Sequence, residues 1–323
     1  METERAYGSR VNEQRIWIGK DFSALCNLRR LMHFSDSRHV PTLLVDNGSL
    51  RPDSVLALRA LAAAASIRTG TEIEPVSLLH SSAIPAEKLD GRRAPILEPE
   101  LRARCAAGNR RFRVLPLFFG PSAALTDYIP ERVAHLQETF PDLRVDLARP
   151  IVDADDAGDD RIARALAERV CETRAKHELT RPHVVLVDHG SPRPGVARVR
   201  DHVARQLACV LGEAATSVTA ASMERREGEA YAFNEPLLAR ALEALAVADA
   251  RAEIVVALMF FSPGRHAGAG GDIAEICADV VGRFPDLRVR ITDVLGAHPG
   301  LIDVLTDRWR ELAARDTGAQ TDG

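Results

Sequence analysis

One pattern occurs twice in this chain, and the duplication restricts the possible folds more than any other feature. Leu-Val-Asp-Asn-Gly-Ser at 44–49 returns as Leu-Val-Asp-His-Gly-Ser at 186–191, 142 residues later. Two further pairs of segments match in the same order: 112–121 with 254–263, and Phe-Pro-Asp-Leu-Arg-Val at 140–145 with 284–289. Ordered matches at nearly one offset indicate an internal duplication, and the period is far too long for a solenoid.

Each copy alternates continuous apolar runs with amphipathic stretches. Runs such as 184–187 and 254–261 are typical of buried parallel strands, and the apolar spacing after Pro194 fits a helix. The sequence therefore predicts an α/β protein with two tandem domains, each a parallel sheet of about four strands flanked by helices. The predicted divisions are an extension at 1–40, a first domain at 41–170, a linker at 171–182, a second domain at 183–314 and a tail at 315–323.

Composition excludes several classes of partner. The 323 residues carry 42 Lys and Arg against 46 Asp and Glu, and aromatic residues make up only 5%, so we expect no nucleic-acid face. No apolar run approaches the roughly 20 residues of a membrane span, and the first 30 residues do not resemble a signal peptide, so we expect a cytoplasmic protein without a membrane partner. The absence of a GxxxxGK[ST] sequence argues against a nucleotide.

Two histidines of the second copy follow predicted strands. His189 comes after the first strand and His266 after the third. The carboxyl ends of parallel strands share one edge of a sheet, so both imidazoles are expected in one crevice, where they would suit a divalent metal such as Co, Fe or Ni. Glu224 follows the second strand and is the candidate acidic helper. The alternatives are a histidine that packs a loop and a glutamate in a solvated run of charges.

Arginines and glycines flank these positions. Four arginines on predicted rim loops would pair with a polyanionic ligand: Arg193, Arg225, Arg226 and Arg265. Gly268 and Gly270 precede a helical pattern and would offer backbone N–H groups to an anion. The alternatives are that each arginine is an ordinary surface residue and that the glycines serve loop geometry alone.

The first copy lacks both histidines. Asn47 stands where His189 stands, and Ala124 stands where His266 stands, while His80 lies near the position of Glu224. The first copy is therefore expected to be non-catalytic. His298 follows the fourth strand of the second copy, and we expect it to start a helix.

The second-copy motifs resemble those of the class II tetrapyrrole chelatases. The residues are His-Gly-Ser at 189–191, Ser-Met-Glu-Arg-Arg-Glu-Gly at 222–228 and Pro-Gly-Arg-His-Ala-Gly at 263–268. They are most similar to the two-domain CbiX-type sirohydrochlorin cobaltochelatases, whose relatives insert iron. The resemblance covers about Pro41 to Leu312. This chain departs from the pattern in one respect, because its histidine pair lies in the second half rather than the first.

The resemblance implies two chelatase-like α/β domains and ATP-independent insertion of cobalt or iron into sirohydrochlorin, in cobalamin or sirohaem biosynthesis. It implies that His189 and His266 bind the metal and act in catalysis, with Glu224 as helper. The eight carboxylates of sirohydrochlorin would account for the rim arginines. The alternative is a non-catalytic tetrapyrrole or metal carrier on the same scaffold. Because one duplicated chain is equivalent to a dimer of halves, either a monomer or a homodimer is expected.

Overall fold

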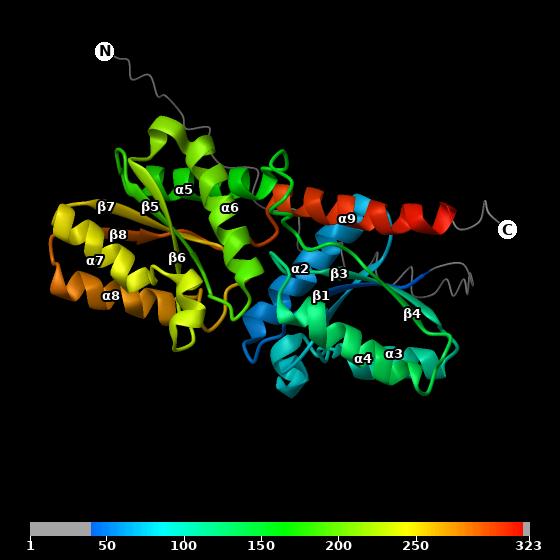
Figure 1. Ribbon diagram of the computed structural model, residues 1–323. Helices are drawn as coiled ribbons and strands as arrows, with labels where there is room; N and C mark the ends of the chain where they lie inside the picture. Colours follow the sequence, from blue (N-terminus) through cyan, green and yellow to red (C-terminus); the bar gives the residue numbers. More distant parts are fainter. Residues whose placement is uncertain (1–39, 319–323) are drawn as a thin grey trace, which may run out of the picture. The chain divides into compact units, whose positions relative to one another are not determined.

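The computed structural model describes residues 40–318, and each half is a run of four strand–helix pairs (Figure 1). The first half contains β1 (Thr42–Asp46), α2 (Pro52–Thr69), β2 (Ile73–Ser77), α3 (Leu97–Ala106), β3 (Arg111–Pro116), α4 (Ile129–Gln137), β4 (Arg144–Leu147) and α5 (Arg161–Lys176). The second half contains β5 (His183–Asp188), α6 (Pro194–Leu211), β6 (Ser217–Ser222), α7 (Leu238–Ala248), β7 (Glu253–Leu258), α8 (Asp272–Arg283), β8 (Arg288–Ile291) and α9 (Pro299–Gly318). The predicted α/β class with two four-stranded parallel sheets is confirmed.

The two sheets have the same topology. Their strand orders are β2-β1-β3-β4 and β6-β5-β7-β8, and all pairings are parallel. The central strands are buried along their length because helices cover both faces, which explains their unbroken apolar sequences. Register places Asp188 opposite Ser222 and, in the first half, Asp46 opposite Ser77. Both carboxyl edges therefore begin with an aspartate beside a serine.

The last helix of each half packs on the sheet of the other half. Helix α5 ends the first half but contacts β7 and α6, and α9 ends the second half but contacts β3 and α2. The largest apolar core accordingly draws residues from both halves, among them Leu115, Leu166, Leu186 and Leu305. Helices α3 and α4 cover the other face of the first sheet, and α7 and α8 cover that of the second. This exchange of helices was not predicted.

Several predicted boundaries fall inside helices. Residues 171–176 of the predicted linker form the end of α5, and α9 continues to Gly318, into the predicted tail. Residues 1–39 of the predicted extension lie outside the described residues. The division into domains stays a prediction. Among residues 40–318, no helix is both long and apolar enough to cross a membrane.

Candidate active site

A tight turn after β5 carries His189. Gly190 has a φ of 90°, which favours glycine, and a Cβ added there would lie 1.9 Å from the carbonyl oxygen of Glu224. The absence of a side chain lets the segment after β6 approach, and the Glu224 N–H donates to the His189 carbonyl at 3.2 Å. The Gly190 position thus brings two of the predicted site residues together.

His266 lies in the loop between β7 and α8, and the structure places its ring beside that of His189. The two ring centroids are 4.6 Å apart and the rings are nearly perpendicular, at 83°. The His266 loop folds back on itself: Gly271 donates to the Gly268 carbonyl, and the Ile273 N–H donates to the His266 carbonyl. The expectation that two imidazoles share one edge of the second sheet agrees with these positions.

Hydrogen bonds fix which nitrogen of each ring is available. His266 Nδ1 lies 2.6 Å from a carboxylate oxygen of Asp272, the first residue of α8, and His189 Nδ1 lies 3.2 Å from the Gly190 carbonyl. Both partners are acceptors, so each Nδ1 carries the proton and a neutral ring keeps a lone pair on Nε2. Sequence reasoning assigned no role to Asp272. Its signal was an acidic residue at a helix start, six positions after a site histidine.

Glu224, two residues after the end of β6, faces His189. Its Oε1 lies 3.7 Å from His189 Nε2, within ion-pair range, and its side chain is 62% exposed. His266 is less accessible, with 28% of its side chain exposed. Within the described part of the chain, no group of three or more His, Cys, Asp or Glu side chains has metal-holding geometry.

The predicted rim arginines have different surroundings. Arg193 pairs with Asp127 of the first half, and Arg225 is held by Glu235 at 2.7 Å and by the Gly228 carbonyl at 2.8 Å. Arg226 lies over the Tyr231 ring. Arg265 is 76% exposed, with its Nε 3.6 Å from Asp272. All four lie on loops after strands, as expected, and substrate binding by them stays a prediction.

Gly268 and Gly270 shape the His266 loop. A Cβ on Gly268 would lie 2.7 Å from the Gly264 carbonyl oxygen, and Gly270 has a φ of 66°. Both glycines are therefore needed for the shape of the loop. That they also bind an anion stays a prediction. His298 accepts from the Gly300 N–H at the start of α9, which confirms its expected helix-start position.

The first half has no counterpart of this cluster. Its Gly48 has a φ of 89°, and a Cβ there would meet the carbonyl oxygen of Leu79, just as Gly190 meets Glu224. The Leu79 N–H also donates to the Asn47 carbonyl. The structural equivalent of Glu224 is therefore Leu79 rather than its neighbour His80. One amide and two apolar side chains occupy the three positions in the first half: Asn47, Leu79 and Ala124.

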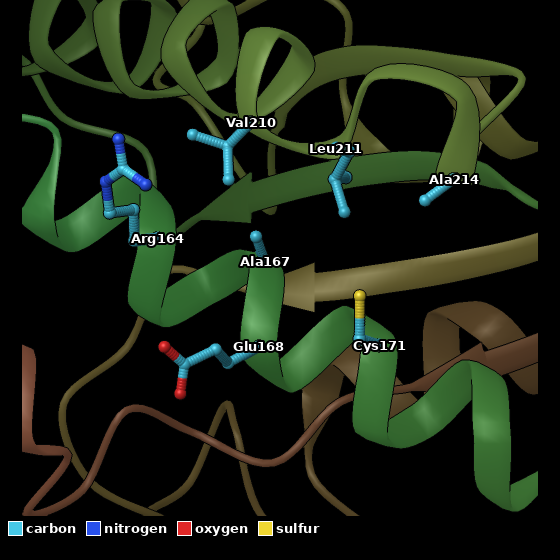
Figure 2. A pocket seen from close by; sticks show the side chains of 7 residues that line it. All are labelled: Arg164, Ala167, Glu168, Cys171, Val210, Leu211 and Ala214. Atoms are coloured by element: carbon cyan, nitrogen blue, oxygen red, sulfur yellow. The ribbon is translucent and has the colours of Figure 1, made fainter.

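A separate hollow of about 280 Å³ lies between α5 and α6 (Figure 2). Its walls carry Glu168 and Cys171 from α5 and Val210 and Leu211 from the far end of α6. Helix α6 starts beside the His189 turn and has 18 residues, about 27 Å of length. The hollow is thus remote from the paired histidines, and its one carboxylate contacts His298.

Known proteins resemble this chain in sequence and in fold. The CbiX family model matches residues 41–173 and again residues 183–312. The chain belongs to the CbiX family. This assignment confirms the resemblance to class II chelatases, and each match covers one copy of the duplication. A curated relative, sirohydrochlorin ferrochelatase from Priestia megaterium, is 31% identical over 115 residues, which span 35% of this chain and 41% of that protein. The match therefore covers less than half of the relative.

Solved structures share the fold. SirB from Bacillus subtilis with Fe³⁺ has a TM-score of 0.61 at 18% identity, covering 86% of this chain and 97% of that chain. A cobalt complex of the sirohydrochlorin chelatase SirB from a Bacillus subtilis subspecies gives 0.59 at 17% identity, with the same coverage. At such identities, the likeness shows that this CbiX-family chain has the chelatase fold.

Proposed function

We propose that this protein inserts a divalent metal, Co²⁺ or Fe²⁺, into sirohydrochlorin without ATP. The observation that carries the proposal is the pair of imidazoles 4.6 Å apart, each with Nδ1 engaged and Nε2 available. Two neutral Nε2 atoms at one edge of a sheet are suitable ligands for a borderline divalent ion. The names of the similar proteins support the choice of sirohydrochlorin as the substrate and of cobalt or iron as the metal.

The proposed reaction exchanges protons for a metal. One M²⁺ replaces the two protons of two pyrrole N–H groups, so two protons must leave each macrocycle. His189 and His266 would hold the ion through Nε2 and pass it to the ring nitrogens. Glu224, mostly exposed and 3.7 Å from His189, is the proposed acceptor, which takes the two protons one after the other and releases each to solvent. His266 is oriented by Asp272, an arrangement typical of metal-binding histidines.

The eight carboxylates of sirohydrochlorin call for cations at the rim. Arg265 is the best placed of the predicted arginines, because it adjoins His266 and most of its side chain faces solvent. Arg193 and Arg225 would first have to leave Asp127 and Glu235. The first half would contribute no metal ligand, since Asn47, Leu79 and Ala124 offer only a weak amide donor.

A spectroscopic assay tests the proposal. Purified protein is mixed with excess sirohydrochlorin and Co²⁺ or Fe²⁺, and the absorption spectrum is followed with time. Metallation of many equivalents per chain is expected, and a His189→Ala, His266→Ala double variant should fall to the rate without protein. Binding of one equivalent without turnover would instead favour the non-catalytic carrier, and an unchanged rate in the double variant would remove the histidines from the site.

A further inference from the structure

A buried polar network lies beneath the turn that carries His189. Asp188 ends β5, and its Oδ1 accepts from the Gly190 N–H at 3.1 Å and from the Ser222 hydroxyl at 2.6 Å. Ser222 Oγ in turn accepts from the guanidinium of Arg200 on α6. These three residues are all buried, and Arg200 is only 2% exposed. Burial raises the pKa of Asp188, and Ser222 and Arg200 act in the opposite direction.

Asn234 clamps the other end of the turn. Its Oδ1 accepts from the Ser191 N–H at 3.0 Å, and its Nδ2 donates to the Ser191 carbonyl at 3.0 Å. Asn234 is fully buried. Arg200 donates to the carbonyls of Phe233 and Asn234, each at 3.1 Å, so it anchors the segment that holds the clamp. The His189 turn is therefore fixed on both sides of the histidine by side chains that solvent does not reach.

The equivalent turn of the first half is held by a smaller network, in which Ser81 Oγ donates to Ser77 Oγ at 2.9 Å. Arg200 corresponds to Leu58, since α2 and α6 have equal lengths and begin 142 residues apart. Asn234 corresponds to Arg93, because the Ser77 bond to the Pro95 carbonyl repeats the Ser222 bond to the Pro236 carbonyl. In place of a two-sided clamp, Ser81 Oγ alone accepts from the Ser49 N–H at 3.0 Å. Arg59, the neighbour of Leu58, donates to the carbonyls of Arg92 and Arg93, which correspond to those of Phe233 and Asn234. Both halves therefore anchor this segment through an arginine, and the second half adds the guanidinium bond to Ser222 and the two-sided clamp on Ser191.

The difference between the halves has an energetic meaning. Burying a guanidinium costs several kcal/mol before its contacts offset the loss of water, and an apolar residue at the same place is often equally stable. The chain nevertheless has the charge under the turn with the histidine and a leucine under the turn without it. Anchoring of the segment after the second strand is common to both halves, so the half with the histidine is distinguished by the burial of its guanidinium, by the bond from Arg200 to Ser222 and by the Asn234 clamp.

We propose that Arg200 and Asn234 are positioning residues that hold His189 against His266 for metal binding. Two ligands must converge on one ion, so a shift of the turn that carries one of them weakens the site without unfolding the protein. The metal in this inference rests on the proposed function. The distance between the His189 and His266 rings does not depend on the proposed function, so it has a test of its own.

The first test is a Co²⁺ titration by calorimetry, without tetrapyrrole. Asn234→Ala and Arg200→Lys are compared with Ser81→Ala, which removes the matched contact from the first half. Loss of a residue that orients a metal ligand typically weakens binding by about tenfold to a hundredfold, and that decrease is expected for both second-half variants. Ser81→Ala should bind Co²⁺ like the natural protein. Equal affinity in all four proteins would overturn the proposal.

The second test needs no metal. With ¹⁵N-labelled histidine, proton NMR should give cross-peaks between the His189 and His266 rings, whose centroids are 4.6 Å apart. We expect Asn234→Ala to lose them and Ser81→Ala to keep them. If the natural protein binds neither Co²⁺ nor Fe²⁺, the proposed function fails, and the cross-peaks still test whether Arg200 and Asn234 position His189. If Asn234→Ala does not fold, Asn234→Ser, which keeps a smaller polar group, takes its place. Intact cross-peaks both in the Asn234 variant and in Arg200→Lys would show that these residues do not position His189.

Discussion

At the scale of single residues, Asp272 determines which nitrogen of His266 can meet a metal. Its carboxylate accepts a hydrogen bond from Nδ1 at 2.6 Å, so the proton stays on Nδ1 and the lone pair is on Nε2. We expect Asp272→Ala to lower the chelation rate at limiting metal by about tenfold to a hundredfold, because the ring loses both orientation and tautomer. Steady-state kinetics with Co²⁺ varied provide the measurement. Glu275→Ala, which also removes an acid from the first turn of α8, should retain full activity and controls for the helix dipole.

Arg265 is the arginine whose removal should weaken substrate binding most. One charged hydrogen bond is worth about 1.5–3 kcal/mol, so Arg265→Ala should raise the KM for sirohydrochlorin by roughly tenfold or more, with a smaller effect on kcat. The effect should shrink at high salt, since the side chain is 76% exposed. Arg193→Ala is the comparison, because Arg193 already pairs with Asp127. If both variants have the KM of the natural protein at every salt concentration, the ligand is less anionic than sirohydrochlorin.

The buried aspartate of the first half gives a pH effect on stability. Burial raises the pKa of Asp46 to about 6, from an ordinary value of 3.8. Its contribution to stability is complete below the lower value and is lost as pH rises through 6, because the folded protein must then bury a carboxylate. A shift of this size corresponds to at most about 3 kcal/mol. Asp46→Asn should therefore raise the free energy of urea unfolding at pH 8 and have little effect at pH 3.5. An equal effect at both pH values would contradict this account.

At the scale of elements, strand and helix order could be read from the sequence because the central strands bury continuous apolar runs and the helices between them bury apolar side chains. The residues that hold the turn of His189 in place could not be predicted. Asn234 lies 43 residues from Ser191 along the chain, and only the packing of the segment after β6 brings them together. Leu79 was missed as the equivalent of Glu224 because the two copies differ in length between the matched motifs. The structure resolves that ambiguity, because Gly48 approaches the Leu79 carbonyl as Gly190 approaches the Glu224 carbonyl.

The loops after β3 and β7 show why restoring histidines should not create a second site. His266 occupies a glycine-rich loop, whereas Ala124 starts a π-helical turn, Ala124–Tyr128, that runs directly into α4. The direction of a histidine side chain at position 124 would therefore be set by a helical turn and not by a loop like that of His266. The triple variant Asn47→His, Leu79→Glu, Ala124→His should therefore bind the same number of Co²⁺ ions per chain as the natural protein. Equilibrium dialysis measures this number, and one additional ion per chain would contradict the argument.

At the scale of the whole molecule, the exchanged helices make the two halves interdependent. The apolar face of α9 is completed by β3 and α2, and that of α5 by β7 and α6. The sequence predicts helices flanking each sheet, but local periodicity carries no information on which of two similar sheets a helix would cover. Since the largest core includes residues of both halves, neither sheet can lose its partner without exposing apolar surface.

Urea unfolding should accordingly be one transition rather than two. Trp309 lies on α9 beside the shared core and reports that helix, while far-UV circular dichroism reports both halves; a Trp17→Phe background removes the other tryptophan. The two probes should give the same midpoint. Leu305→Ala, at a fully buried position of α9, should lower the free energy of unfolding by about 2–5 kcal/mol and shift both curves together. Leu166→Ala on α5 should do the same, although α5 belongs to the first half of the sequence and α9 to the second. Separate midpoints for the two probes, or a shift in only one of them, would mean that the halves unfold independently despite their exchanged helices.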